Sequence, residues 1–202
     1  MKKLIVAASA ILLSVTAVQA QEEVSFGAKG GVNFATVGGD DFDDPDARTS
    51  FHIGGFVEVP LTDKFSLQPE VYYSGQGYDI QSNDNADDIE FQLDYINVPV
   101  LAKYYFVDGF YGEVGPQIGF NINSEIDSNP DGDSGDINFN SDAINTIDFG
   151  VVGGLGYKLN NGLFFNARYN LGLSDVFSSE DLGGFDIDAR NRVFMIGAGF
   201  AF

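Results

Sequence analysis

The segment 147–173 reads IDFGVVGGLGYKLNNGLFFNARYNLGL, and it contains the clearest fold signal in the chain. On both sides of Asn161-Gly162, apolar residues alternate with polar residues or glycine, which is the period of a β-strand. Asn-Gly between two alternating runs is the strongest short-range signal for a β-hairpin. We therefore predict two antiparallel strands joined by a tight turn at Asn160-Asn161-Gly162.

The same alternation continues through most of the chain after residue 20. It predicts eight strands, at about residues 24–38, 50–60, 65–79, 91–106, 110–123, 146–159, 163–175 and 189–202. Three of the gaps between them are tight-turn sequences, whereas the other four are long and rich in Asp, Asn, Ser and Gly. Short turns at one end and long loops at the other are typical of membrane barrels. The predicted fold is all-β, an eight-stranded antiparallel up-and-down transmembrane β-barrel with both termini on the short-turn side.

The composition narrows the function classes. The chain has 202 residues, which fits one domain or two small ones, and its 30 Asp and Glu against 10 Lys and Arg give a formal charge of −20. So acidic a chain is unsuited to nucleic acid, whose phosphates need a basic face. The absence of cysteine excludes disulfides and thiol nucleophiles, and the single histidine, His52, excludes a His-rich zinc site.

Residues 1–20 have the pattern of an export signal. Lys2 and Lys3 precede an apolar run that ends at Val18, and Ala20 provides a small residue for cleavage. We predict a signal peptide at 1–20 and a barrel domain at 21–202. An N-terminal membrane anchor is the alternative, although the apolar run is short for a spanning helix.

The acidic residues lie mainly in the four long gaps, at 39–49, 79–90, 124–145 and 175–190. These gaps hold 21 of the 30 acidic residues and two arginines, which leaves 19 net negative charges there. A membrane barrel must keep charge out of its hydrocarbon band. The location of the charge therefore indicates acidic extracellular loops.

The polar face of the strands separates a membrane barrel from a soluble one. A lipocalin-like barrel is apolar inside, whereas an outer-membrane barrel is apolar outside. Here the polar face carries equal numbers of positive and negative charges among amides and glycines, which favours a sealed, hydrogen-bonded interior without an open pore. The predicted barrel-interior network comprises Lys29, Glu58, Glu70, Lys103, Glu113, Asp148, Lys158 and Arg168.

Aromatic residues gather near the short turns, where membrane barrels have an interfacial girdle. The predicted girdle comprises Phe65, Tyr104, Tyr105, Phe106, Phe110, Tyr111, Tyr157, Phe164 and Phe165. The chain ends on Phe202, which resembles the terminal insertion signal of outer-membrane barrels. That resemblance implies recognition of Phe202 by the barrel assembly machinery.

Five longer motifs carry a family resemblance. They are FGAKGGVNF at 26–34, LTDKFSLQPE at 61–70, YINVPVLAKYYF at 95–106, GPQIGF at 115–120 and VFMIGAGFAF at 193–202. On these motifs the chain resembles the PorT-type outer-membrane β-barrel family of Bacteroidetes-like bacteria. The resemblance implies an eight-stranded outer-membrane barrel but no single activity, because some members assist protein secretion and others have no assigned role.

The third long gap contains a candidate calcium loop at 127–138. Its candidate ligands are Asp127, Asn129, Asp131 and Asp133. Carboxylate and amide oxygens at this spacing suit Ca²⁺. However, the twelfth position is Asn138 instead of a bidentate glutamate, so an acidic solvated loop is the alternative.

The enzymatic candidate is a group of His52, Ser50 and a loop aspartate, as in barrel hydrolases. His52 lies on the inward face, and the chain has no Gly-x-Ser-x-Gly sequence. We therefore predict a hydrogen-bonded lumen histidine and no enzymatic activity.

The sequence thus predicts a non-enzymatic protein of the bacterial outer membrane with a structural or adhesive surface role. Its expected partners are outer-membrane lipid and lipopolysaccharide, the latter bridged to the acidic loops by divalent cations, or an extracellular partner. An accessory role in protein secretion or transport across the outer membrane is the alternative, and it rests on family analogy alone.

Overall fold

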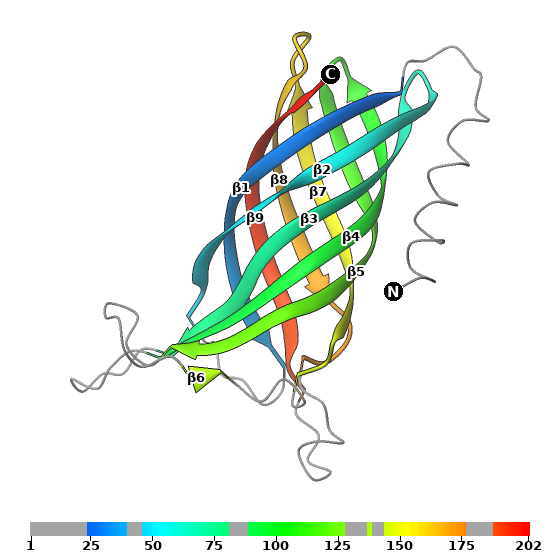
Figure 1. Ribbon diagram of the computed structural model, residues 1–202. Helices are drawn as coiled ribbons and strands as arrows, with labels where there is room; N and C mark the ends of the chain where they lie inside the picture. The colour runs from blue at the N-terminus through cyan, green and yellow to red at the C-terminus, as the bar shows by residue number, and fades with distance from the viewer. Residues whose placement is uncertain (1–23, 40–45, 81–88, 128–136, 139–143, 177–187) are drawn as a thin grey trace, which may run out of the picture.

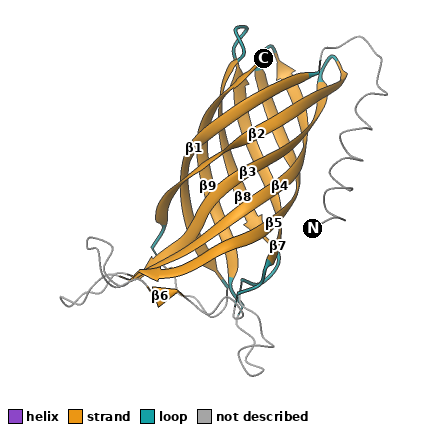
Figure 2. Cartoon of the chain, viewed as in Figure 1, coloured by secondary structure: helices purple, strands orange, loops and turns teal. Residues whose placement is uncertain are grey.

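The computed structural model describes residues 24–39, 46–80, 89–127, 137–138, 144–176 and 188–202. In these residues, eight long strands and one two-residue strand form an antiparallel sheet (Figures 1 and 2). The strands are β1 (Ser25–Gly38), β2 (Arg48–Thr62), β3 (Phe65–Ile80), β4 (Ile89–Val107), β5 (Phe110–Asp127), β6 (Ile137–Asn138), β7 (Ile147–Lys158), β8 (Leu163–Gly172) and β9 (Arg190–Ala201). The described part of the chain has no helix long and apolar enough to cross a lipid bilayer.

The long strands close into a cylinder. They follow the order β4-β3-β2-β1-β9-β8-β7-β5, and a further pairing between β4 and β5 joins the two ends of the sheet. The first and last strands, β1 and β9, pair from Gly27↔Ala201 to Gly38↔Arg190. The predicted all-β, eight-stranded antiparallel barrel is therefore confirmed.

The side chains are oriented as the alternation predicts. Phe149 and Leu155 on the outer face of β7 are 51% and 53% exposed, whereas Lys103 and Arg168 are 3% and 2% exposed. Apolar side chains thus face outward, and charged side chains face inward. This orientation excludes a lipocalin-like barrel, whose apolar face would line the interior.

The three tight turns lie at the same end of the barrel (Figure 1). They join β2 to β3, β4 to β5 and β7 to β8, as predicted. Gly109 and Gly162 have φ angles of +78° and +91°, a backbone region in which glycine is unstrained. β1 begins and β9 ends on this side as well, where Phe26 and Phe202 exchange two backbone hydrogen bonds of 3.1 and 2.8 Å.

The strands β3, β4 and β5 are longer than predicted, with 16, 19 and 18 residues. They extend beyond the other strands on the long-loop side (Figure 1). They exceed the roughly 9–11 residues that a tilted strand needs to cross a bilayer. Parts of the predicted gaps at 79–90 and 124–145 thus belong to strands, namely residues 79–80, 89–90, 124–127 and 137–138. Immediately next to the added residues, the rings of Tyr78 and Phe91 stack with centroids 4.6 Å apart.

The girdle at the short-turn end is confirmed in part. Tyr104, Phe106, Phe110, Tyr157 and Phe165 are exposed on the outer face. Tyr111 and Phe164, however, are buried inside the barrel, and Tyr105 points to an interior carboxylate. The prediction was wrong for these three because neighbouring residues on a strand face opposite sides, so consecutive aromatics cannot all face the lipid.

The barrel interior contains an apolar cluster toward each end. An apolar cluster of Phe56, Phe164 and Ala201 lies near the short turns. A second apolar cluster of Leu93, Tyr95, Ile144 and Val176 lies near the long loops. Buried charged and amide side chains fill much of the interior around these clusters, and Glu58 lies closer to the β2–β3 turn than Phe56 does.

Candidate functional site

Arg168 is the centre of the charged interior. Its guanidinium extends from β8 and donates two hydrogen bonds of 2.8 Å to Glu70 on β3. It also donates hydrogen bonds of 2.6 and 3.0 Å to Glu113 on β5. Paired bonds between guanidinium and carboxylate are among the strongest hydrogen bonds in proteins. Arg168 thus links three strands across the interior.

Glu70 extends this group toward β1 and β4. Its carboxylate also accepts a hydrogen bond from the ammonium of Lys29 and one of 2.6 Å from Gln68 Nε2. The other amide atom of Gln68, Oε1, accepts a bond of 2.9 Å from Lys103 Nζ. Gln68 therefore connects the Arg168 group to a second group of charges.

The second group is centred on Glu58 of β2. Its carboxylate lies 3.3 Å from Lys103 Nζ and 3.3 Å from Lys158 Nζ, and it accepts a hydrogen bond of 2.6 Å from the hydroxyl of Tyr105. Lys103 Nζ also lies 3.9 Å from the centre of the Tyr111 ring, a cation–π contact. Every carboxylate of the two groups is therefore paired with at least one cation.

Glycines make room for these side chains. A Cβ atom on Gly154 would lie 2.8 Å from Arg168 Cγ. A Cβ atom on Gly156 would lie 2.3 Å from the Tyr111 ring. Protein interiors are close-packed, so these positions need the smallest residue where a neighbouring side chain is large.

The structure brings seven of the eight predicted network residues together. They are Lys29, Glu58, Glu70, Lys103, Glu113, Lys158 and Arg168. The side chain of Lys158 is 27% exposed at the short-turn end, and the other six are buried. Asp148 is also buried but lies apart, bonded to Ser174 and Asn191. Tyr105 and Tyr111 belong to the network, and the sequence reasoning missed them although they share strand faces with Lys103 and Glu113.

His52 lies inside the barrel, as expected for a lumen histidine. It is buried, and its Nδ1 is 2.7 Å from Asn33 Oδ1. Ser50 donates its hydroxyl hydrogen to the carbonyl of Gly75 rather than to His52. Among the described residues, His52 therefore has no serine in hydrogen-bonding contact.

The candidate calcium ligands lie mostly outside the described residues. Asp127 ends β5, whereas Asn129, Asp131 and Asp133 fall in the segment 128–136, which the structure does not describe. Within the described ranges, no group of three or more His, Cys, Asp or Glu side chains is arranged to hold a metal ion.

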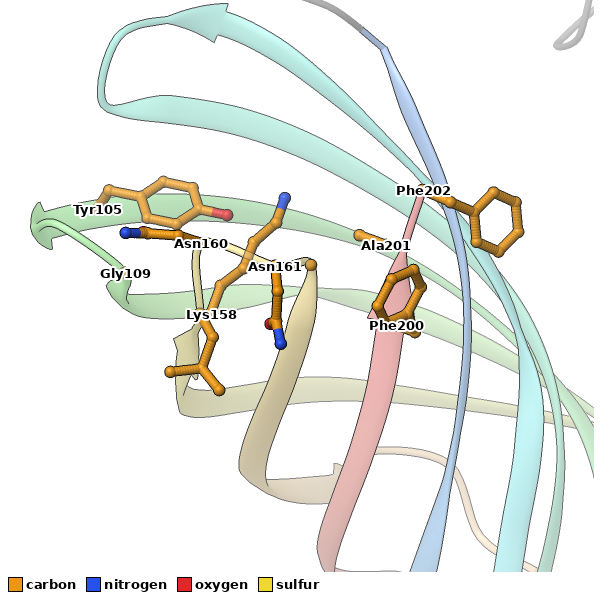
Figure 3. A pocket seen from close by; sticks show the side chains of 10 residues that line it. Tyr105, Gly109, Lys158, Asn160, Asn161, Phe200, Ala201 and Phe202 are labelled. Carbon is orange, nitrogen blue, oxygen red and sulfur yellow. The ribbon is translucent and has the colours of Figure 1, made fainter.

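A cavity of about 620 Å³ opens at the short-turn end (Figure 3). It is lined by Tyr105, Lys158, Asn160, Asn161, Phe200 and Phe202, among others. The cavity lies at the rim of the barrel, between the turns at Gly109 and at residues 160–162 and the end of β9, and the network residues Tyr105 and Lys158 reach it. No sequence signal indicates it, because its walls come from three separate segments of the chain.

A family model and several solved structures match the chain. The family model described as outer membrane protein beta-barrel domain matches residues 19–178. The fold is similar to that of Ail, the attachment invasion locus protein of Yersinia pestis, solved in complex with the heparin analogue sucrose octasulfate. For Ail the identity is 15%, the TM-score is 0.52, and the match covers 90% of this chain and 100% of that one. Neisserial surface protein A is similar at 13% identity and a TM-score of 0.57, over 90% of this chain and 100% of that one. No curated protein matches the sequence.

Proposed function

Because this chain belongs to the outer membrane protein beta-barrel domain family, we propose that it is a non-enzymatic outer-membrane barrel with a sealed interior and an acidic outer surface. The bacterial outer membrane is the location of that family. A structural or adhesive role at the cell surface is the function that this arrangement supports best.

The bridge from Arg168 to Glu70 and Glu113 carries the proposal of a sealed interior. It links β8, β3 and β5 through bonds of 2.6 to 3.0 Å. An eight-stranded barrel has an interior just wide enough for side chains to fill. Because these side chains are paired with one another, hydrated ions have no open path between them.

We expect the purified barrel to show no steady conductance in planar lipid bilayers. A porin with 16 strands, measured in the same bilayers, is the positive control because such barrels leave an aqueous channel. Reproducible single-channel steps in the nanosiemens range from the pure protein would contradict the sealed interior.

The acidic gaps support the surface role. Together they hold 19 net negative charges, and the candidate calcium loop lies within the third of them. Ail was solved with a sulfated heparin analogue. Loops as acidic as these would repel such a polyanion, so we propose that divalent cations bridge them to anionic lipopolysaccharide or to an acidic partner.

We expect vesicles that contain the protein to bind lipopolysaccharide-coated surfaces in millimolar Ca²⁺ and to release them in EDTA. The matched variant Asp131→Asn/Asp133→Asn removes two loop charges without changing the size of the side chains, and it should bind more weakly. Binding that persists unchanged in EDTA would count against cation bridging.

The finer family assignment remains a proposal. The PorT-type resemblance supports an accessory role in protein secretion as the second candidate. The terminal Phe202, which is exposed on the outer face, supports recognition by the barrel assembly machinery. Isolation of the protein from native outer membranes distinguishes the two roles. A secretion partner recovered in equal amount would favour the secretion role. A lone barrel would support the surface role, and a first residue of Gln21 would support cleavage after Ala20.

A further inference from the structure

Asp148 is a buried carboxylate on the inner face of β7 without a cation beside it. Its Oδ1 accepts a hydrogen bond of 2.7 Å from the Ser174 hydroxyl, and its Oδ2 lies 3.3 Å from Asn191 Nδ2. None of the ion pairs formed by the described residues includes Asp148. By contrast, Glu58, Glu70 and Glu113 each form an ion pair with a lysine or arginine.

Buried amide oxygens without partners lie around this carboxylate. Asn97 and Asn191 are almost completely buried, and the Oδ1 atom of each, like the Nδ2 atom of Asn97, makes no hydrogen bond within the described protein. The Nδ2 of Asn191 lies within 3.3 Å of both Asp148 Oδ2 and the hydroxyl of Tyr95. Buried polar atoms are nearly always paired, so unpaired amide oxygens on two side chains next to Asp148 require an explanation.

Gly119 brings Asn97 close to Asp148. The pairing of β4, β5 and β7 places Asn97, Gly119 and Asp148 side by side. A Cβ atom on Gly119 would lie 2.7 Å from Asn97 Oδ1 and 3.5 Å from Asp148 Cβ. Because glycine has no side chain there, the Asn97 oxygen and the Cβ atom of Asp148 border the same small space.

An isolated carboxylate in a protein interior must be neutralised, either by a proton or by a cation. Carboxylate, amide and hydroxyl oxygens are the ligands that hard cations prefer. One carboxylate balances one positive charge, whereas Ca²⁺ sites combine several carboxylates. We propose that Asp148, with the Oδ1 atoms of Asn97 and Asn191, binds a monovalent cation such as Na⁺ inside the barrel.

The proposed Na⁺ site is distinct from the charged network and from the candidate calcium loop. The apolar cluster of Leu93, Tyr95, Ile144 and Val176 lies beside it toward the long loops. The cations of the charged network are already paired with Glu58, Glu70 and Glu113. The site therefore depends neither on the candidate calcium loop nor on the proposed surface role.

The test measures the stability of the refolded full barrel in detergent as a function of Na⁺. Unfolding midpoints are compared in NaCl and in N-methyl-D-glucamine chloride at equal ionic strength, so that screening is the same. Specific binding to the folded state lowers the unfolding equilibrium constant about 11-fold when the Na⁺ concentration is ten times the dissociation constant. We expect a saturable stabilisation by Na⁺ that the bulky organic cation does not reproduce.

Two variants and a control locate the effect. Asp148→Asn keeps the shape of the side chain and removes its charge, so the dependence on Na⁺ should disappear. Asn97→Ala keeps the charge and removes one oxygen, so half-maximal stabilisation should need at least about tenfold more Na⁺. Asp94→Asn, at a part-exposed carboxylate that also accepts hydrogen bonds from a tyrosine and an asparagine, should respond as the unchanged protein does.

Two outcomes overturn the proposal. Equal stability of the unchanged protein in both salts would mean that Asp148 is neutralised by a proton. An undiminished Na⁺ effect in both Asp148→Asn and Asn97→Ala would place the bound ion elsewhere. Crystals soaked in thallium(I), a monovalent probe with strong anomalous scattering, should show a peak beside Asp148.

Discussion

Replacement of Arg168 by alanine is expected to destabilise the barrel by about 3–5 kcal/mol, the usual cost of removing one partner from a buried ion pair. The guanidinium is the only cation that bonds to Glu113 among the described residues, and it provides two of the bonds to Glu70. Its loss leaves the Glu113 carboxylate buried and unpaired. Equilibrium unfolding in urea, followed by the mobility shift on unboiled gels, measures the change.

Two variants serve as controls for this prediction. Arg192→Ala removes an exposed arginine from β9 and should change stability by less than about 0.5 kcal/mol. Arg168→Ala/Glu113→Gln removes the stranded charge as well and should recover part of the loss. If Arg168→Ala and Arg192→Ala cost the same, the interior is hydrated enough to screen its charges, and the sealed barrel is wrong.

Replacement of Ile196 by arginine should destabilise the barrel in lipid vesicles by about 2–4 kcal/mol, because its position places a charge near the bilayer midplane. Ile196 lies at the middle of β9, faces outward, and pairs with Val32 and Ala167 on the neighbouring strands. Urea titration of the barrel in vesicles measures the effect.

Leu61→Arg is the matched control for depth. Leu61 and Ile196 are each 50% exposed, but Leu61 lies next to the turn between β2 and β3. At the interface the same substitution should cost only about 0–1 kcal/mol. Similar losses of stability at the two positions would contradict the prediction, because a bilayer is apolar at its midplane and polar at its surface.

The fold could be predicted from the sequence because each strand has lipid on one side and the barrel interior on the other. Successive residues of a strand therefore alternate between apolar, as at Phe149, and polar or small, as at Arg168. This two-residue period identifies both the strands and the side that each residue faces. The ends of β4 and β5, at residues 89 and 127, were not predicted, although the alternation continues there, for example with Ile89 and Phe91 on either side of Glu90. The surrounding residues are rich in Asp and Asn, which are typical of loops, and composition alone does not show where strand pairing stops.

The members of the charged interior could be predicted, but their pairing could not. The alternation of side chains along a strand identifies Glu70 and Arg168 as inward-facing residues. Their contact joins positions 98 residues apart, and it depends on how far neighbouring strands are displaced along the barrel. The same displacement places Asp148 away from the lysines and arginines. No local pattern in the sequence predicts that displacement.

The pairing of β1 with β9 has a consequence for the synthesis of the protein. The residues that meet at this seam, such as Gly27 and Ala201, come from opposite ends of the chain. A nascent polypeptide that lacks its final dozen residues therefore cannot complete the cylinder, and every partial sheet keeps two open edges that invite pairing with other chains. A polypeptide truncated before β9 is therefore expected to aggregate through the exposed edges of β1 and β8 rather than to close into a smaller barrel.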